Sequence, residues 1–313
     1  MGIRALTIAM LCCLGCTRTP DAGRVVCVVT VDWEGAELDP DGLDAIDWLR
    51  KRTHGPITHF VSAAYFTKAE PEPVAATIVE MVKPGDELAV HLHVWRSLAK
   101  ASGVEPRISP SYLSGDDTVE DYDGDAGYET DPDVYDANEL RAMLRTSRQL
   151  LAQAKLPVSR SFRGPGFLAT PKLLAAASSE GFTVDSSAFD HREIDADTEA
   201  HRTRVAGVWP RVEAGSAPFV VGSVLELPIT AFADFTSPEE ITTRIDAAYT
   251  RLSADPTRDV FVVFAMNLET AGALAGRLGH GLEAARAAHG DLVFATVEHA
   301  GTLARAGLGL API

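Results

Sequence analysis

The sequence is short of basic residues. Lysine and arginine number 28 against 44 aspartates and glutamates, which gives a formal net charge of −16 over 313 residues. A protein that binds nucleic acid needs a basic patch to neutralise phosphates, and the sequence shows none, so that class of function is excluded. The same excess of acid disfavours an anionic membrane surface or a polyanionic substrate.

Cysteine is also scarce, with four residues in the whole chain. Three of them, Cys12, Cys13 and Cys16, lie within the first sixteen residues, and Cys27 lies within an expected strand. We expect Cys27 to be a small buried hydrophobe. With Cys16 lipidated, as argued next, an intramolecular disulfide is impossible and a cysteine-based metal site is excluded.

The apolar run at 5–15 is too short to span a bilayer but has the length of a signal-peptide core. It ends in a Leu-Gly pair before Cys16 and resembles a bacterial lipoprotein signal. The resemblance implies that residues 1–15 are removed, that Cys16 carries the lipid and that 16–23 is a polar tether. It also implies export to the bacterial cell envelope, with membrane contact through the lipid anchor only. An ordinary signal peptide with incidental cysteines is the alternative.

A β-branched run at 25–31 ends in two closely spaced acids, Asp32 and Glu34. Because the run is apolar on both parities, it predicts a parallel strand that is buried on both faces. Strand side chains alternate, so the two carboxylates point to one side and Trp33 to the other. Two acids at the end of a buried strand are unfavourable unless they serve a function. A strand end that frays into a polar turn is the alternative.

Strand and helix patterns alternate through 24–313 without a repeat or an interdomain linker. The further expected strands are 57–62, 87–93, 158–162, 183–186, 224–229, 260–266 and 292–296. The expected helices are 39–52, 74–82, 137–155, 171–180, one from 237 onward, 273–288 and a closing helix. Roughly seven or eight βα units in one run predict a single-domain α/β fold, a distorted (β/α) barrel rather than an open sheet.

In such barrels, chemistry gathers at the carboxyl ends of the strands. The expected ends carry complementary polar residues, namely Asp32, Glu34, His91, His93, Arg163, Glu226, Asn267 and Glu269. By strand parity, His91 and His93 share one face. Two imidazoles and one carboxylate that leave a position open are the ligands of a catalytic zinc site. We therefore predict a divalent metal, with zinc favoured.

These motifs resemble those of the NodB-homology polysaccharide deacetylases, carbohydrate esterase family 4. The matching segments are Val29-Thr30-Val31-Asp32-Trp33-Glu34, Glu87-Leu88-Ala89-Val90-His91, Arg163-Gly164-Pro165 and Val224-Leu225-Glu226-Leu227-Pro228. The resemblance covers about 24–303. It implies a distorted (β/α) barrel that uses a divalent metal, often zinc, to remove acetyl groups from sugars.

The resemblance also implies roles for individual residues. Glu34, His91 and His93 would bind the metal. Asp32 would be the general base, and Arg163 would orient the carboxylate of Asp32.

The sequence departs from the family pattern at two places. Trp95 stands where the second metal histidine is usual, so His93 is the expected substitute, and Asn267 stands near the usual general-acid histidine. We predict that Glu269 is the acid, with an acid at a helix start as the alternative. Trp95, Glu226 and Asn267 are the expected substrate-binding residues. The same departures resemble a related branch that acts on other amide or ureide bonds.

The stretch 97–136 breaks the rhythm of the chain, and ten acids lie between 116 and 136. Because it follows the histidines, we expect it to cover the active face. A solvated acidic loop and a calcium site are both open, although the spacing misses that of an EF-hand. Its charge suits neutral acetylated sugars or sugars with free amines.

Taken together, the sequence indicates a metal-dependent hydrolase that removes acetyl groups from an envelope or extracellular carbohydrate. The alternative is a carbohydrate-binding envelope lipoprotein that kept the barrel and lost catalysis, because the usual acid histidine is missing at Asn267.

The lipid anchor can be tested by replacing Cys16. We expect Cys16→Ser to leave the membrane fraction, because the acyl chains attached to this residue supply the membrane affinity. Fractionation of expressing cells measures the change. Retention of the variant in the membrane pellet at the wild-type level would show that the anchor lies elsewhere.

Overall fold

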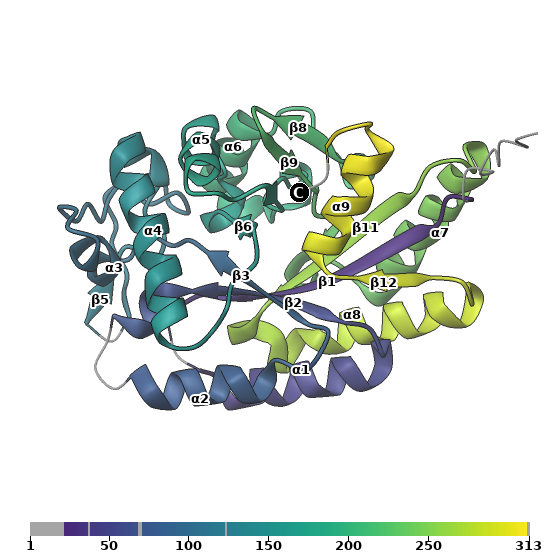
Figure 1. Ribbon diagram of the computed structural model, residues 1–313, viewed down its shortest axis with the longest axis horizontal. Coiled ribbons are helices and arrows are strands. Elements are labelled where there is room, and N and C mark those ends of the chain that lie inside the picture. The colour runs from purple at the N-terminus through teal and green to yellow at the C-terminus, as the bar shows by residue number, and fades with distance from the viewer. Residues whose placement is uncertain (1–21, 37, 68–70, 123, 312–313) are drawn as a thin grey trace, which may run out of the picture.

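The computed structural model describes residues 22–36, 38–67, 71–122 and 124–311 (Figure 1). The expected signal at 1–15 and the lipid site at Cys16 lie outside these residues and stay predictions.

The strand β1 (Val25–Trp33) is buried along its whole length, as its apolar pattern predicts. It pairs in parallel with β11 (Val260–Asn267) from one end to the other. On its second edge it pairs with β12 (Val293–Ala295) near its start and with β2 (Ile57–Ser62) near its end. Its central place sets Asp32 directly beside Asn267 on the neighbouring strand.

Ten of the described strands form one sheet in the order β10-β11-β1-β2-β3-β6-β7-β9-β8, with β12 beside β1. The remaining bounds are β3 Glu87–His91, β6 Ser161–Arg163, β7 Val184–Asp185, β8 Phe219–Val221, β9 Val224–Glu226 and β10 Ala231–Phe232. All described pairs in this sheet are parallel except β8 with β9. The parallel order brings the carboxyl ends of distant segments to one edge.

Helices cover the sheet on both sides (Figure 1). Their bounds are α1 Pro40–Thr53, α2 Pro71–Met81, α3 Arg96–Ala101, α4 Ala137–Gln153, α5 Pro171–Ser179, α6 Glu199–Val208, α7 Pro238–Ala254, α8 Leu268–Ala288 and α9 Val297–Gly307. Local sequence sets several of their starts. Asp39 caps α1 before Pro40, and Ser237 forms a capping box with Glu240 at α7. Among the described helices, none combines the length and apolar character needed to cross a bilayer.

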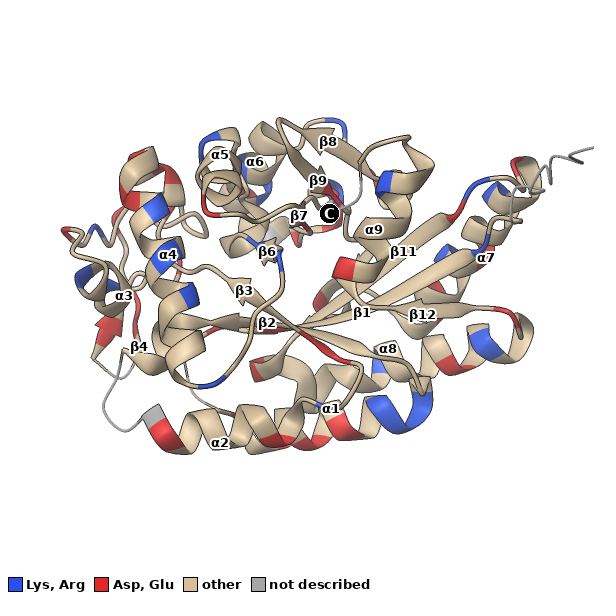
Figure 2. Cartoon of the chain, viewed as in Figure 1, with Lys and Arg blue, Asp and Glu red and all other residues tan. Residues whose placement is uncertain are grey.

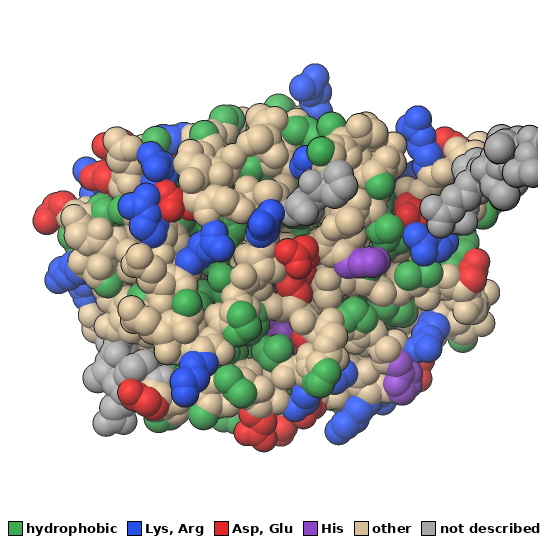
Figure 3. Space-filling model, viewed as in Figure 1, with side chains coloured by type: hydrophobic (Ala, Val, Ile, Leu, Met, Phe, Trp, Pro, Cys, Tyr) green, Lys and Arg blue, Asp and Glu red, His purple; other side chains and the backbone are tan. Residues whose placement is uncertain are grey.

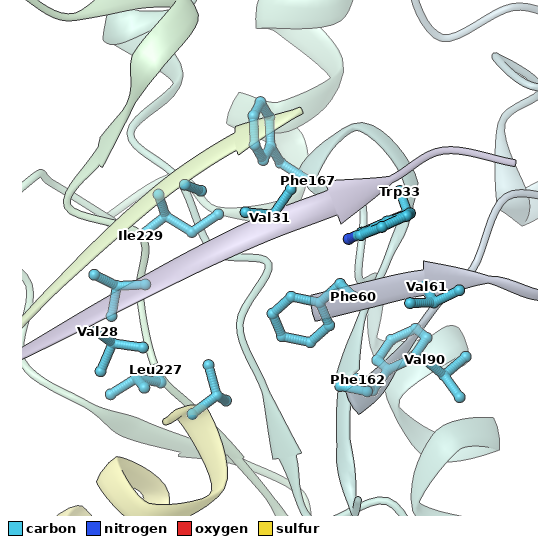
Figure 4. Close-up of a cluster of buried hydrophobic side chains, with 14 of the residues drawn as sticks. Val28, Val31, Trp33, Phe60, Val61, Val90, Phe162, Phe167, Leu227 and Ile229 are labelled. Carbon is cyan, nitrogen blue, oxygen red and sulfur yellow. The ribbon is translucent and has the colours of Figure 1, made fainter. Parts of the chain in front are cut away.

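Apolar side chains from β1, β2, β3 and β6 pack on both faces of the sheet (Figure 4). They include Trp33, Phe60, Val90 and Phe162, all of which are fully buried. The Trp33 indole nitrogen donates to Nδ1 of His59 at 3.2 Å, so the one polar atom of this ring is satisfied in the core.

The surface carries the acidic excess in a dispersed form. Figure 2 shows acidic positions along α1 and α2, and Figure 3 shows acidic and basic side chains interspersed with apolar ones on the face in view. Such a mixture fits a protein that does not bind polyanions through this face.

Element ends differ from the expectations at three places that matter for the site. β3 ends at His91, so His93 lies beyond the strand and its direction is not set by strand parity. α8 begins directly after β11, which places Glu269 in the first helical turn. The acidic insertion, expected to lack regular structure, contains α3 and a short hairpin of β4 (Asp121–Tyr122) and β5 (Asp125–Ala126).

Asp86 ties three segments of this fold together. Its side chain, 1% exposed, accepts from the Arg50 guanidinium at 2.7 Å and from the backbone amides of Ile57 and Lys83 at 2.9 Å. Burial alone would raise the pKa of Asp86, but hydrogen bonds from His59 and Arg50 hold it below its ordinary value. Its stabilising contribution is therefore present at neutral pH and is lost as pH falls below about 4.

We expect Asp86→Ala to lower the free energy of unfolding by about 3 kcal/mol, because it leaves the Arg50 guanidinium and two amides without their acceptor. Urea denaturation at pH 7 measures this change. Asp44→Ala, at an exposed position of α1, is the control and should stay within about 0.5 kcal/mol of wild type. Equal effects of the two substitutions would contradict the role of Asp86.

Candidate active site

The carboxyl ends of β1, β3, β6 and β11 open into one cavity of about 180 Å³. It is lined by Asp32, Glu34, His91, His93, Tyr112, Leu113, Tyr128, Arg163, Gly164, Gly166, Phe167, Thr198, His201, Phe232, Asp234, Phe235 and Asn267. The sequence-based expectations thus placed Asp32, Glu34, His91, His93, Arg163 and Asn267 around a common space. Clefts and cavities with a few convergent polar groups are the usual form of a small-molecule site.

Glu34, His91 and His93 form a compact cluster in this cavity. One ligand atom from each residue lies within 4.8 Å of the others. Glu34 Oε2 is 3.1 Å from Nε2 of His91 and 2.5 Å from Nε2 of His93, and the two Nε2 atoms are 3.1 Å apart. All three side chains are buried.

Backbone carbonyls fix the orientation of both imidazoles. Nδ1 of His91 lies 3.2 Å from the carbonyl oxygen of Arg163, and Nδ1 of His93 lies 2.6 Å from that of Tyr128. A carbonyl only accepts, so each Nδ1 carries the hydrogen and each Nε2 of a neutral ring offers a lone pair. Two lone pairs and a carboxylate oxygen then face one another, an arrangement that a bound cation would stabilise.

These residues therefore fit a divalent metal. Two neutral imidazoles and a carboxylate are the donor set of catalytic zinc sites, and a carbonyl behind each ligating histidine is the usual outer support. Burial acts to raise the pKa of Glu34, but without a metal, protonated His91 and His93 would supply charges and hydrogen bonds that lower it, so the carboxylate is ionised.

Asp32 is held by a buried guanidinium. Arg163 Nη1 donates to Asp32 Oδ1 at 2.6 Å and to the Thr30 hydroxyl at 2.9 Å. Asp32 is 3% exposed and Arg163 is 1% exposed. Burial raises the pKa of Asp32, while the Arg163 charge opposes that rise, and the net direction is upward.

The segment after β7 supports Arg163 from the other side. Arg163 Nε donates to the Ser186 carbonyl at 2.6 Å, and Nη2 donates to the Ser186 hydroxyl at 3.1 Å. Glu226 Oε1 accepts from the amides of Ser187 and Ala188, and Asp185 lies next to Glu226 on the neighbouring strand. Burial and the Asp185 charge raise the pKa of Glu226 well above its ordinary value.

Three residues assigned from the sequence lie outside the lining of the cavity. Glu226 is fully buried behind the segment after β7, and Trp95 is fully buried and donates from its indole nitrogen to the Glu34 carbonyl at 2.9 Å. Glu269 accepts from the Glu34 amide at 3.3 Å and from the Tyr65 hydroxyl at 3.4 Å. The contacts of Trp95 and Glu269 hold the backbone of Glu34 in place, and their assigned roles in substrate binding and proton transfer stay predictions.

Other residues in the cavity are not among the site residues assigned from the sequence. The insertion supplies Tyr112, Leu113 and Tyr128, and the Tyr128 ring stacks on His93 with centroids 4.5 Å apart. His201 comes from α6, and Asp234 from the turn η6 (Ala233–Phe235) after β10. Position at a strand end would have indicated Asp234, had the two-residue strand before it been recognisable.

Comparison with known proteins bears on the fold. No family model and no curated protein matches the chain. A protein assigned as a polysaccharide deacetylase from Mycobacterium smegmatis aligns with TM-score 0.54 and 16% identity over 94% of each chain. A protein assigned as a polysaccharide deacetylase from Pseudomonas aeruginosa aligns with TM-score 0.51 and 14% identity over 91% of this chain and 92% of the other. PuuE allantoinase aligns with TM-score 0.52 and 14% identity over 91% of each chain.

This chain has their fold. The expected distorted (β/α) barrel is thereby confirmed, and identities of this size establish the fold alone.

The metal cluster predicts how single substitutions change metal content. We expect His91→Ala and His93→Ala each to lower bound zinc at least about tenfold, because each removes one of three ligands, while circular dichroism stays like that of wild type. Elemental analysis of protein purified without chelator measures this, and His280→Ala, at an exposed position, is the control. Full zinc occupancy in His93→Ala would remove that residue from the site.

Proposed function

We propose that this protein is a metal-dependent hydrolase that removes acetyl groups from an envelope or extracellular carbohydrate. The observation that carries the proposal is the cavity in which the cluster of Glu34, His91 and His93 lies beside the ion pair of Asp32 and Arg163. A metal-ligand set next to a buried carboxylate of raised pKa is the equipment for hydrolysis of an acyl bond.

Glu34, His91 and His93 would hold the metal, with zinc favoured by the donor set. When bound, a divalent metal supplies Lewis-acid polarisation of the acyl carbonyl and stabilises negative charge on its oxygen. The protein contributes rigid donors, because the Arg163 and Tyr128 carbonyls fix both imidazole rings.

Asp32 acts as the general base. Its carboxylate takes a proton from the attacking water, and Arg163, which also donates to the Thr30 hydroxyl, keeps it aimed at the cavity. The upward direction of its pKa strengthens it as a base relative to an exposed aspartate. Because a base must be ionised, turnover should fall as pH drops through the pKa of Asp32.

The walls of the cavity suit a neutral sugar. Tyr112, Tyr128 and Phe167 present aromatic rings at its lining, and the net charge of −16 disfavours anionic substrates. Anchoring through lipid at Cys16 would hold the enzyme at the bacterial cell envelope, where acetylated carbohydrate is within reach.

A second candidate is a carbohydrate-binding envelope lipoprotein without catalysis. The observation that favours it is Asn267, which lines the cavity near the position where the resembled family carries its acid histidine. An amide side chain does not transfer a proton at physiological pH.

Hydrolysis assays separate the two candidates. We expect the zinc-loaded protein to release acetate from acetylated chito-oligosaccharides or aryl acetates, and Asp32→Asn to lower turnover by roughly 10²–10⁴-fold with metal content unchanged. Acetate release across pH 5–9 measures the turnover of wild type and of Asp32→Asn. Binding of the oligosaccharide without hydrolysis, with zinc, cobalt or manganese present, would favour the binding protein.

A further inference from the structure

Hydrolysis of an amide needs a proton donor for the leaving nitrogen, and the cavity must supply it. Asn267 lies at the end of β11, directly beside Asp32, and cannot perform this transfer. Asp32 is engaged with Arg163, and Glu34, His91 and His93 form the metal cluster. Among the other lining residues, the ionisable candidates for a separate donor are Tyr112, Tyr128, His201 and Asp234.

The order of the sheet places Asp234 on the far side of Asn267 from Asp32. β10 pairs with β11 through Ala231 and Phe232, and the chain turns into η6 immediately afterwards. β1 pairs with the opposite edge of β11. Base and candidate donor therefore sit at the carboxyl ends of the two strands that flank β11, and both reach the same cavity.

Hydrogen bonds from neighbouring residues fix the position of Asp234. Among the described residues, no cationic side chain forms an ion pair with its carboxylate. The Thr270 hydroxyl, in the first turn of α8, donates to Asp234 Oδ1 at 3.3 Å. The Arg277 guanidinium donates at 3.2 Å to the backbone carbonyls of Ala233 and Asp234. These contacts anchor the turn from behind and orient the side chain that lines the cavity.

Burial favours the protonated form of this carboxyl group. Burial and the Glu34 charge raise the pKa of Asp234, and Thr270 and Arg277 oppose the rise, so that the pKa reaches about 6. The other charged or titratable groups that line the cavity are Asp32, His91, His93, Tyr112, Tyr128, Arg163 and His201. A carboxyl group with this pKa still holds a substantial share of its proton near neutral pH, as a general acid requires.

The alternatives are less well equipped. The His201 Nε2 hydrogen bonds to the Gly166 carbonyl at 2.9 Å, and burial lowers the pKa of His201, so the neutral ring has no proton on Nδ1 to give. Burial raises the pKa of Tyr112 and Tyr128 well above the ordinary value, which makes both weak acids. Burial and the Glu34 charge also raise the pKa of Glu269 well above its ordinary value, but Glu269 is not among the residues that line the cavity.

We infer that Asp234 donates the proton to the leaving nitrogen of an amide substrate, and this inference rests on the proposed hydrolase function. Asp32 takes one proton from water, and the remaining hydroxide oxygen bonds to the acyl carbon. The carbon–nitrogen bond then breaks, its electron pair stays on nitrogen, and Asp234 protonates that nitrogen. The products are a carboxylic acid and an amine, and the proton on Asp32 returns to Asp234 through solvent.

The test compares leaving groups. Release of the amine of an N-acetylated chito-oligosaccharide needs a proton, whereas 4-nitrophenolate leaves from 4-nitrophenyl acetate without one. We expect Asp234→Asn to lower turnover of the amide by roughly a hundredfold or more, with turnover of the aryl ester within about threefold of wild type. In wild type, amide turnover should fall above pH 6, and this fall should be absent in Asp234→Asn. Asp234→Glu should recover part of the lost amide turnover.

Matched variants make the outcome decisive. Glu269→Gln tests the other candidate acid. Glu239→Gln, at an exposed position of α7, is the control. Zinc content and circular dichroism are measured for each variant. A loss of amide turnover confined to Glu269→Gln, or an equal loss on both substrates in Asp234→Asn, would overturn the assignment of Asp234. Wild-type protein that hydrolyses neither substrate would instead overturn the proposed hydrolase, and the donor assignment with it.

Discussion

The buried guanidinium of Arg163 is the group on which the site depends. A cation taken out of water is tolerated only when its charge and its donors are matched. Asp32 matches the charge, Ser186 and Thr30 accept its hydrogen bonds, and the ring of Phe60 lies 4.3 Å away. Because β1, β2 and the segment after β7 each contribute, Arg163 has all of its partners only when these segments are assembled in the sheet. The fold and the site therefore depend on the same contacts.

Three carboxyl groups share one cavity, and their surroundings give each a different state. Asp32 is paired with Arg163, and Glu34 faces two imidazoles that offer lone pairs. Asp234 has no cation on its carboxylate among the described residues and has a pKa of about 6. Separation of protonation states by environment is what the proposed roles of base, metal ligand and acid require of these three groups.

The strands buried on both faces could be predicted from the sequence, because their apolar runs and abrupt polar ends are local signals. That pattern placed Asp32 and His91 at the edge where the structure has them. By contrast β10, at two residues, is too short to show a period, so Asp234 could not be located. His93 lies beyond the end of β3, and its ring is oriented by Tyr128 from a segment without a regular pattern. Such tertiary contacts leave no mark on local sequence.

The insertion contacts His93 through both the backbone and the side chain of Tyr128. The Tyr128 carbonyl accepts from His93, and every amino acid would provide the same oxygen at that place. The Tyr128 ring, in contrast, stacks on His93 and forms part of the cavity wall. Evolution can therefore exchange the side chain at 128, and with it the shape offered to the substrate, while the hydrogen bond that orients the imidazole is inherited unchanged.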